Sequence, residues 1–565
     1  MKFRFLASTL AWLGINSQSG NRSGISAHAT MSVKERTNTL FSILVPSGEE
    51  QSRSATIRSL VRQTCTRWEA FICTANGLDN TPLAGSLEER RLQLLQTTTT
   101  DGVLEVLQAY VNGDWLIVLK PGSVLADDAL HVVEQLLARR PEALAFYSDS
   151  ALTDITGRVT GFCLHPAWSP DYFDAVPYPD GLVGIRASLI KQWSEHTTAH
   201  VEPWFFPFLR EIGRTPGAIC HVAEVLLLRP ETQSLSWLGR ESRAAFLSSL
   251  DRTDAGVVAE PDTLPGSLRV THLLSVTPSV EIVIPTHNGG AMLRHCLESV
   301  FNKTDFPAFK VAIVDNRTTD PSALAFLADV AARPGVRLIR YDEPFNFSAI
   351  NNLAVSTSDA EVICLLNDDV EVISPGWLTE MVSHAWRQEV GAVGARLLYP
   401  DGRVQHAGIV VGMRRSAAHG HKGAARQDDG YMGRLRVVQN CTAVTGACLV
   451  VSREKYLEVG GMDDQRLTVA YNDVDFCLKL RKAGYQNVWT PYAELLHHES
   501  ATRGRDSSPA KRRRLKSEAR LMEERWGMST FQDPYYHPAL TLKCEDFSVA
   551  EKPWPLSKRR RMICR

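Results

Sequence analysis

Three polar side chains follow a short apolar run near the middle of the chain. Ile363 to Leu366 is typical of a buried parallel strand, and Asn367, Asp368 and Asp369 come directly after it. Open α/β sheets bind ligands in the crevice at the carboxyl ends of their strands. Adjacent carboxylates repel unless a cation lies between them, and oxygen ligands suit Mg²⁺ or Mn²⁺. We therefore expect a divalent metal that bridges a diphosphate; a solvated acidic turn is the alternative.

The surrounding pattern alternates strands and helices, which predicts a parallel, doubly wound α/β sheet. In the second half the strand ending in Asn367 is accompanied by further predicted elements: strands at 280–288, 309–314, 336–341 and 390–398, and helices at 291–301, 321–332, 348–356 and 377–387. The first half shows the same alternation, with strands at 41–45, 68–73 and 115–119 and a helix at 54–63.

The two halves resemble each other, which indicates an internal repeat. Residues 42–46 (Ser-Ile-Leu-Val-Pro) match residues 281–285 (Glu-Ile-Val-Ile-Pro), and residues 113–119 match residues 359–365. A chain of 565 residues is also too long for one core. We predict a poorly structured leader, an α/β domain, a linker with a short strand near 268–270, a second α/β domain and a basic tail, at residues 1–36, 37–235, 236–278, 279–530 and 531–565.

Composition excludes several classes of protein. The chain is 44% apolar and 22% charged with a net charge of −1, so no overall field recruits nucleic acid, and none is expected as a partner. Its eleven cysteines form no Cys-x-x-Cys pair, which favours reduced thiols in the cytoplasm. The Gly-x-Gly-x-x-Gly of a dinucleotide-dependent oxidoreductase is missing after the strand that ends at His287.

No clear targeting or spanning segment is evident in the sequence. The apolar run from Phe5 is short for a signal peptide and lacks a clear cleavage site; a cleaved signal or an amphipathic membrane-touching segment are the alternatives. No window approaches the roughly 20 apolar residues of a spanning helix. We expect a cytoplasmic protein, with peripheral contact with the inner membrane face left open. The basic runs at 511–516 and 558–561 are solvated faces or sites for anionic headgroups.

From Val280 to about Gly504 the chain resembles the family 2 glycosyltransferases, which have the GT-A fold. The motifs that carry this resemblance occur in the family's order: Pro285-Thr-His-Asn288, Pro344-Phe-Asn-Phe-Ser-Ala-Ile-Asn-Asn352, Asn367-Asp-Asp369, Tyr471-Asn-Asp-Val-Asp-Phe476 and Leu496-His-His-Glu-Ser500. The segment is most similar to bacterial enzymes of O-antigen and surface-polysaccharide assembly, including rhamnosyltransferases. The resemblance implies metal-dependent transfer of a sugar with inversion.

The resemblance also implies roles for individual residues on the donor side. Asp369 corresponds to the metal-binding member of the Asp-x-Asp signature, with Asn367 in its first place, and Asp368 to a ribose or second metal contact. His497 or its neighbour His498 corresponds to the late histidine that joins the metal, and we favour His497. The residues implied to bind the nucleotide sugar are Pro285, Thr286, His287, Asn288, Asp315 for the base, Asn351 for the diphosphate, and Asp368.

On the acceptor side the family needs one carboxylate to take a proton from the attacking hydroxyl. Asp473 matches that base, and its place at a helix N-terminus favours the ionised form. Asp475 is the competitor, as a structural residue in the first helical turn. Residues that match the acceptor-side stretches are Gly446, Asp463 and Asp464. Arg503 is a candidate phosphate contact, and residues 414–433 read as a mobile loop over the acceptor or a disordered insertion.

The first half resembles the same family with its chemical positions replaced. Thr74-Ala75 stands where the family places Asp, and Lys120-Pro-Gly-Ser123 stands where the Asp-x-Asp motif belongs. Residues 201–206 lack the base motif, with Trp204 and Phe206 in place of acids, and residues 225–229 lack the late histidine. We interpret this half as a degenerate transferase domain used for packing, acceptor grip or assembly.

The sequence thus predicts an inverting, metal-dependent glycosyltransferase with one active domain. It would move a sugar from a nucleotide donor, dTDP-rhamnose first and UDP-sugars next, to a polysaccharide or a lipid-linked oligosaccharide in cell-surface glycan or O-antigen biosynthesis. The alternative is a non-catalytic glycan-binding or scaffold protein of a polysaccharide assembly complex. A processive membrane synthase is disfavoured because Glu524-Arg-Trp526 does not match its Gln-x-x-Arg-Trp motif.

Overall fold

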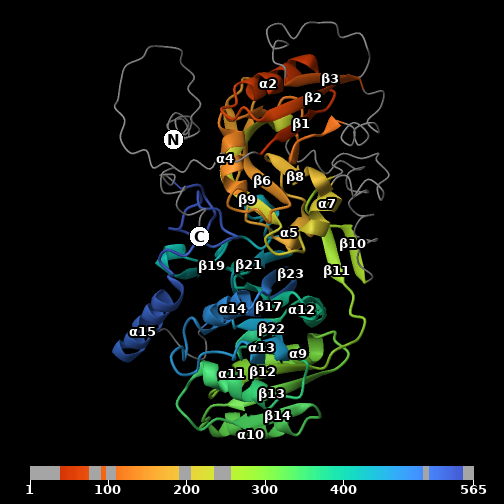
Figure 1. Ribbon diagram of the computed structural model, residues 1–565. Helices are drawn as coiled ribbons and strands as arrows, with labels where there is room; N and C mark the ends of the chain where they lie inside the picture. Colours follow the sequence, from red (N-terminus) through yellow and green to blue (C-terminus); the bar gives the residue numbers. More distant parts are fainter. Residues whose placement is uncertain are drawn as a thin grey trace. The chain divides into compact units, whose positions relative to one another are not determined.

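The computed structural model describes residues 39–74, 91–96, 110–189, 205–233, 256–499 and 508–550. The chain divides into two compact units (Figure 1), one formed by residues 1–168, 177–246 and 552–565 and the other by residues 169–176 and 247–551. The predicted leader, the cluster at 558–561, Glu202, Trp204 and Arg503 lie outside the described residues.

The first unit is built on a mixed sheet in the order β3-β2-β1-β4-β8-β6-β9-β5, with β7 beside β6. Its strands are β1 (Phe41–Val45), β2 (Trp68–Thr74), β3 (Leu92–Gln96), β4 (Trp115–Val118), β5 (Val124–Leu125), β6 (Ala145–Thr153), β7 (Val159–Cys163), β8 (Val183–Arg186) and β9 (Ile219–Pro230). Its helices are α2 (Glu50–Val61), α4 (Ala129–Leu137) and α7 (Phe205–Ile212), and η1 (Glu231–Gln233) is a 3₁₀ turn. The apolar sides of β1, β4, α2 and α4 form its main core.

The second unit is built on a sheet in the order β14-β13-β12-β15-β22-β17-β23-β16, with β18 beside β17 and β21 beside β23. These strands are β12 (Val280–Thr286), β13 (Phe309–Asp315), β14 (Val336–Arg340), β15 (Val362–Leu366), β16 (Val370–Val372), β17 (Val390–Leu398), β18 (Val404–His406), β21 (Gln439–Cys441), β22 (Cys448–Ser452) and β23 (Gln486–His497). Its helices are α5 (Pro170–Ala175), α9 (Gly290–Lys303), α10 (Pro321–Ala331), α11 (Phe347–Ser356), α12 (Trp377–Ala385), α13 (Arg453–Glu458), α14 (Asn472–Lys482) and α15 (Pro509–Trp526).

The eight strands on the main path of each sheet follow the same topology. β1, β2, β3 and β4 correspond to β12, β13, β14 and β15, and β8, β6, β9 and β5 correspond to β22, β17, β23 and β16. Each corresponding pair of neighbours has the same direction: for example, β1–β4 and β12–β15 are parallel, and β4–β8 and β15–β22 are antiparallel. The α/β class with two tandem domains of one fold is thereby confirmed.

The prediction of a wholly parallel sheet was wrong. The strands β14, β13, β12 and β15 are parallel, but β22 runs antiparallel to both β15 and β17. An antiparallel neighbour needs no crossover helix, so the alternation of strands and helices in the sequence did not indicate this strand. All seven residues of β12 and all five of β15 are buried, which explains the continuous apolar run of β15 and the apolar residues 282–285 of β12.

The segment 414–433 is folded rather than a disordered insertion. It contains β20 (Ala417–His419), which pairs with β19 (Ile409–Val411), and two 3₁₀ turns, η3 (Met413–Arg415) and η4 (Tyr431–Gly433). His421 stacks on Phe547, with ring centroids 4.0 Å apart. Residues 531–550 therefore pack on the second unit, where Asp533 also accepts a hydrogen bond from Val411 N at 2.8 Å.

The stretch of chain that follows the first sheet and precedes the second also contains regular structure. An antiparallel hairpin joins β10 (Val257–Pro261) to β11 (Leu268–His272), and only the second of these strands was predicted. Among the helices of the described ranges, none is both long and apolar enough to cross a bilayer. The ten cysteines in those ranges are all free thiols.

Candidate active site

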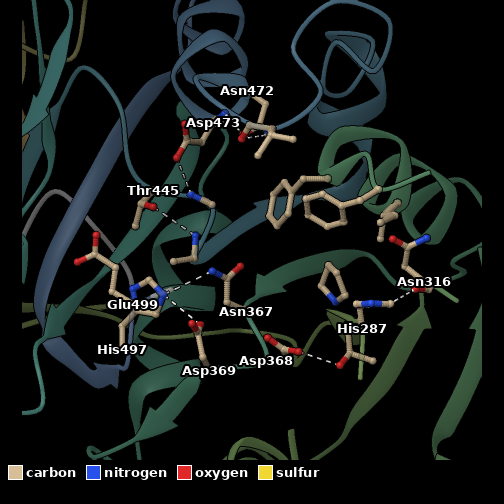
Figure 2. A pocket seen from close by; sticks show the side chains of 18 of the residues that line it. His287, Asn316, Asn367, Asp368, Asp369, Thr445, Asn472, Asp473, His497 and Glu499 are labelled. Carbon is tan, nitrogen blue, oxygen red and sulfur yellow. Dashed lines mark hydrogen bonds and ion pairs between the residues drawn. The ribbon is translucent and has the colours of Figure 1, made fainter. Parts of the chain in front are cut away.

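A cavity of about 720 Å³ opens in the second unit beyond the carboxyl ends of β12 and β15. Figure 2 shows His497 and Asp369 on one side, His287 and Asn316 on the other, and Asp473 across from Asp368 and Asp369. The predicted site residues that line it are Pro285, Thr286, His287, Asp368, Asp369, Gly446, Asp473 and His497. The sheet therefore gathers residues that are more than 200 positions apart in the chain, as the strand-end argument requires.

Asp369 and His497 form the part of the cavity best suited to a metal. Asp369 Oδ1 is buried and has no hydrogen-bond partner among the described residues, and His497 Nε2 lies 3.1 Å from it. Two neighbouring ligands of an octahedral ion with bonds of about 2.1 Å are separated by about 3 Å. The backbone holds the pair together because Val370, directly after Asp369, is in register with His497 across β16 and β23. The residues present therefore fit a divalent cation.

The structure distinguishes the two adjacent histidines. His497 lines the cavity, whereas His498 does not and has its Nε2 atom 3.9 Å from the Glu371 carboxylate. Since successive side chains of a strand point to opposite faces, only one of the two can face Asp369. The geometry favours His497 over His498 as the metal ligand, which agrees with the choice made from the sequence.

Asp368 is fixed by a neighbouring strand. Thr286 Oγ1 donates a hydrogen bond to Asp368 Oδ2 at 2.8 Å, and both residues are buried. Gly289 is needed here, because a Cβ atom at that position would lie 2.3 Å from Thr286 Oγ1 and 3.0 Å from Asp368 Oδ2. The first and fourth strands of the repeat thus position this carboxylate jointly.

Asp473 lies at the start of α14 and faces the cavity. Its Oδ2 atom accepts a hydrogen bond from Gly446 N at 3.0 Å, and Oδ1 accepts one from Val474 N at 2.8 Å. Burial raises the pKa of the Asp473 carboxyl above its ordinary value, against the lowering effect of these hydrogen bonds. A raised pKa strengthens a carboxylate as a proton acceptor.

Asp475 is occupied in a different way. It is fully buried, and its Oδ1 atom accepts hydrogen bonds from Arg525 Nη1 at 2.7 Å and Trp526 Nε1 at 2.8 Å. It does not line the cavity. Of the two acids in the first turn of α14, Asp473 is therefore the one that an acceptor hydroxyl could reach.

A buried histidine, His406, and a half-buried one, His419, support the turn beneath Asp473. His406 Nε2 lies 3.4 Å from Thr445 N, and the Nδ1 atoms of His406 and His419 lie 2.8 Å apart. Burial lowers the pKa of His406 well below its ordinary value and that of His419 to about 4. Both rings are therefore neutral near pH 7, and His406 Nε2 accepts the hydrogen bond from Thr445 N.

The far side of the cavity suits a planar, polar group. His287 Nδ1 donates to the Asn316 carbonyl at 2.6 Å, and Asn316 Nδ2 donates to the carbonyls of Tyr341 and Glu343. Asp315 lies behind this surface: it is fully buried, forms an ion pair with Arg340, and accepts from Thr318 N at 3.0 Å. Asn316, rather than Asp315, is the residue of that pair which lines the cavity.

Four other predicted residues do not line this cavity. Asn288 lies in the turn before α9, where its Oδ1 accepts from Thr319 N at 2.9 Å. Asn351 is buried within α11, and its Nδ2 donates to the Phe347 carbonyl at 2.8 Å. Asp463 and Asp464 line a separate cavity of about 600 Å³, where Asp463 pairs with Arg525 at 2.6 Å. Helix and loop packing, which residue spacing does not encode, sets these positions.

Several lining residues were given no binding or catalytic role from the sequence. They are Asn316, Arg317, Thr319, Phe345, Phe347, Ile350, Asn367, Ala447, Thr445, Val469, Asn472, Glu499 and Lys511. Some signals were available: Phe345 and Phe347 lie in the block that carries the family resemblance, and Lys511 begins the basic run at 511–516, in the first turns of α15. The sequence did not indicate that the fold brings α15 to the cavity.

The corresponding positions of the first sheet carry different side chains. β5 corresponds to β16, and Val124 pairs with Leu228 where Val370 pairs with His497. Ser123, which precedes Val124, therefore stands in place of Asp369, and Leu228 stands in place of His497. Asp149, an acid that this half retains, is buried and bonded to His221 and to His165 N. The first sheet thus lacks the carboxylate–histidine pair at the matching register.

Comparison with known proteins agrees with these geometric findings. Residues 281–429 match the family described as Glycosyl transferase family 2. The chain is 35% identical to the uncharacterized protein y4gI of Sinorhizobium fredii, over 89% of this chain and 57% of the relative. It is 32% identical to the O-antigen biosynthesis protein RfbC of Myxococcus xanthus, over 79% of this chain and 35% of the relative.

A third relative matches a smaller share of the chain. The N-acetylglucosaminyl-diphospho-decaprenol L-rhamnosyltransferase of Mycobacterium tuberculosis is 29% identical over 41% of this chain and 80% of its own length. The chain spans little more than half of y4gI and about a third of RfbC. The family match falls within the unit that holds the cavity. Residues 281–429 of the second unit are therefore similar to the Glycosyl transferase family 2 domain.

Proposed function

We propose that the cavity of the second unit transfers a sugar from a nucleotide donor to a glycan or lipid-linked acceptor with inversion, and that it requires Mg²⁺ or Mn²⁺. The observation that carries this proposal is the placement of three groups in one cavity: Asp369, His497 and Asp473. The first two suit a cation, and the third suits a proton acceptor. The first unit would serve packing, acceptor grip or assembly.

Asp369 and His497 would hold the metal, which on binding would neutralise charge on the departing nucleoside diphosphate. Asp368, fixed by Thr286, would bind the ribose. His287 and Asn316 present a ring and an amide to the nucleobase, and Phe345 and Phe347 add apolar surface to the same cavity. The cavity walls thus offer both polar and apolar contacts to a nucleotide.

Asp473 would take the proton of the attacking hydroxyl. Gly446 N and Val474 N hold its two oxygens, so the carboxylate is oriented before an acceptor binds. As the acceptor oxygen attacks the anomeric carbon, the proton passes to Asp473 and the bond to the diphosphate breaks. A single displacement, in which the acceptor oxygen attacks the face opposite the departing diphosphate, inverts the anomeric carbon.

Donor and acceptor are proposed from the relatives and from the family resemblance. The mycobacterial relative is named as an L-rhamnosyltransferase and RfbC as an O-antigen biosynthesis protein, which makes dTDP-rhamnose the first donor to test and UDP-sugars the next. The diphospho-decaprenol in the mycobacterial name supports testing a lipid-linked acceptor. Peripheral contact with the inner membrane face would give access to such an acceptor.

The test is nucleotide release from a panel of dTDP-, UDP- and GDP-sugars with Mn²⁺ or Mg²⁺, for the wild-type chain, Asp369→Ala and Asp473→Asn. We expect slow, metal-dependent hydrolysis of one donor that both variants lose. No nucleotide release from any donor of the panel, together with no metal-dependent nucleotide binding, would contradict the proposal. It would leave the non-catalytic glycan-binding or scaffold protein as the better account.

A further inference from the structure

Gln405 lies directly behind His497 and does not line the cavity. Its Oε1 atom is 2.6 Å from His497 Nδ1, and its side chain is buried. Because an amide oxygen only accepts hydrogen bonds, His497 must carry its proton on Nδ1 for this contact to be favourable. The other ring nitrogen, Nε2, then presents a lone pair toward Asp369.

The orientation of the Gln405 amide is itself fixed by a carboxylate. Gln405 Nε2 donates to Glu499 Oε2 at 3.3 Å. A flipped amide would place its oxygen against the Glu499 carboxylate and its NH₂ group against His497 Nδ1, so both contacts favour the orientation described. Asn367 Nδ2, a donor 3.5 Å from His497 Nε2, agrees with an unprotonated Nε2.

In this tautomer the imidazole of His497 presents an acceptor atom toward Asp369. Its Nε2 lone pair and the Asp369 Oδ1 atom, 3.1 Å apart, are both acceptors and cannot bond to each other. Each lone pair is available to the same cation. Ligand histidines are commonly oriented by such a hydrogen bond at their other nitrogen, and its loss typically lowers metal affinity or activity about 10- to 100-fold.

We propose that Gln405, oriented by Glu499, is a positioning residue that holds His497 in the Nδ1–H tautomer and thereby makes Nε2 a metal ligand. This inference rests on the proposed function, since it assigns His497 to the metal. It adds Gln405, which lies outside the quoted motifs, to the site, and it gives the lining residue Glu499 an orienting role. Gln405 acts through His497 and touches neither donor nor acceptor.

The first experiment measures the tautomer directly in the full-length chain without metal. The ¹⁵N resonances of His497, assigned with a His497→Asn variant, are expected to show a protonated Nδ1 and an unprotonated Nε2. In Gln405→Leu, which is similar in size but accepts no hydrogen bond, the Nδ1–H form should lose its dominance. A wild-type His497 protonated at Nε2 would overturn the inference.

The second experiment measures Mn²⁺ affinity in the presence of UDP or dTDP by calorimetry, with no sugar and no turnover. We expect Gln405→Leu to bind Mn²⁺ about 10- to 100-fold more weakly than the wild type. Gln405→Glu combined with Glu499→Gln exchanges the two side chains but keeps an acceptor at His497 Nδ1 and a donor between them. This pair should restore the affinity to within about threefold, whereas Gln405→Leu combined with Glu499→Gln should not.

These outcomes separate the inference from the proposed function. If the wild type binds no Mn²⁺ with nucleotide, both are overturned. If the wild type binds Mn²⁺ and Gln405→Leu binds it equally well, only the inference fails. Thermal unfolding of each variant, compared with exposed Gln465→Leu as a control, shows whether an affinity change reflects a loss of fold.

Discussion

At the scale of single residues, the two acids in the first turn of α14 differ in surroundings more than in sequence. Asp473 faces the cavity and is held by backbone N–H groups, whereas Asp475 is bound by Arg525 and Trp526. The same residue type, two positions apart, therefore has a chemical role in one case and a structural role in the other. Substitutions can separate the two roles.

Asp473→Asn should reduce kcat by about 10²- to 10⁴-fold, the usual contribution of a general base, with little change in stability. Asp475→Asn should instead destabilise the fold, because it leaves Arg525 without one of its two carboxylate partners. Initial rates and urea unfolding of both variants check this. If Asp475→Asn were stable and lost more activity than Asp473→Asn, Asp475 would be the base and Asp473 the structural residue.

The pKa of Asp473 also predicts a pH dependence. Burial raises this pKa, so the carboxyl binds a proton at a higher pH than an ordinary Asp, near 3.9, would. A base must be unprotonated, so kcat should fall as pH falls through the raised pKa and should level off above it. The acid limb of the pH–rate profile measures this value. A limb at or below the ordinary Asp pKa would contradict the assignment.

At the scale of elements, the sequence predicted most of the strands and helices between Val280 and Leu398 to within a few residues. The strand Phe309–Asp315 and the helix Pro321–Ala331 are examples, because long buried runs and a Pro at a helix start are strong local signals. The sequence did not predict β22 as an antiparallel neighbour or the place of α15 at the cavity. Those depend on contacts between distant segments.

Close packing between β17 and the turn before β22 predicts a sensitive position. A Cβ atom at Gly394 would lie 2.6 Å from Val444 Cβ, and Val444 precedes Thr445 and Gly446, which support Asp473. Gly394→Ala should therefore cost about 1–3 kcal/mol of unfolding free energy and also lower kcat. Gly376→Ala is the control, because nothing lies within 4 Å of its added Cβ. Equal behaviour of the two variants in urea unfolding would refute the packing argument.

The short helix α5 provides a second test at this scale. Asn440 is fully buried and accepts hydrogen bonds from Ser169 Oγ at 2.8 Å and Asp171 N at 3.1 Å, and it donates to Asp171 Oδ2 at 2.7 Å. Asn440→Ala leaves these partners buried without it, so we expect a loss of about 2–4 kcal/mol in unfolding free energy. A loss below about 0.5 kcal/mol would show that the helix is held by other contacts.

At the scale of the whole molecule, one fold occurs twice and the candidate chemistry occurs once. The two sheets share strand order and strand directions, but Ser123 and Leu228 replace Asp369 and His497 at the matching register. The repeated motifs of the sequence predicted this duplication, because each copy keeps the apolar runs that its core needs. The register that pairs Val124 with Leu228 could be determined only from the structure.

We propose that each chain has one metal-dependent nucleotide site, in the second unit. Calorimetric titration of the full-length chain with dTDP or UDP, with and without Mn²⁺, counts such sites. We expect about one Mn²⁺-dependent site per chain, lost in Asp369→Ala and unchanged in Ser123→Ala. Two sites per chain, or a site that survives Asp369→Ala, would contradict it.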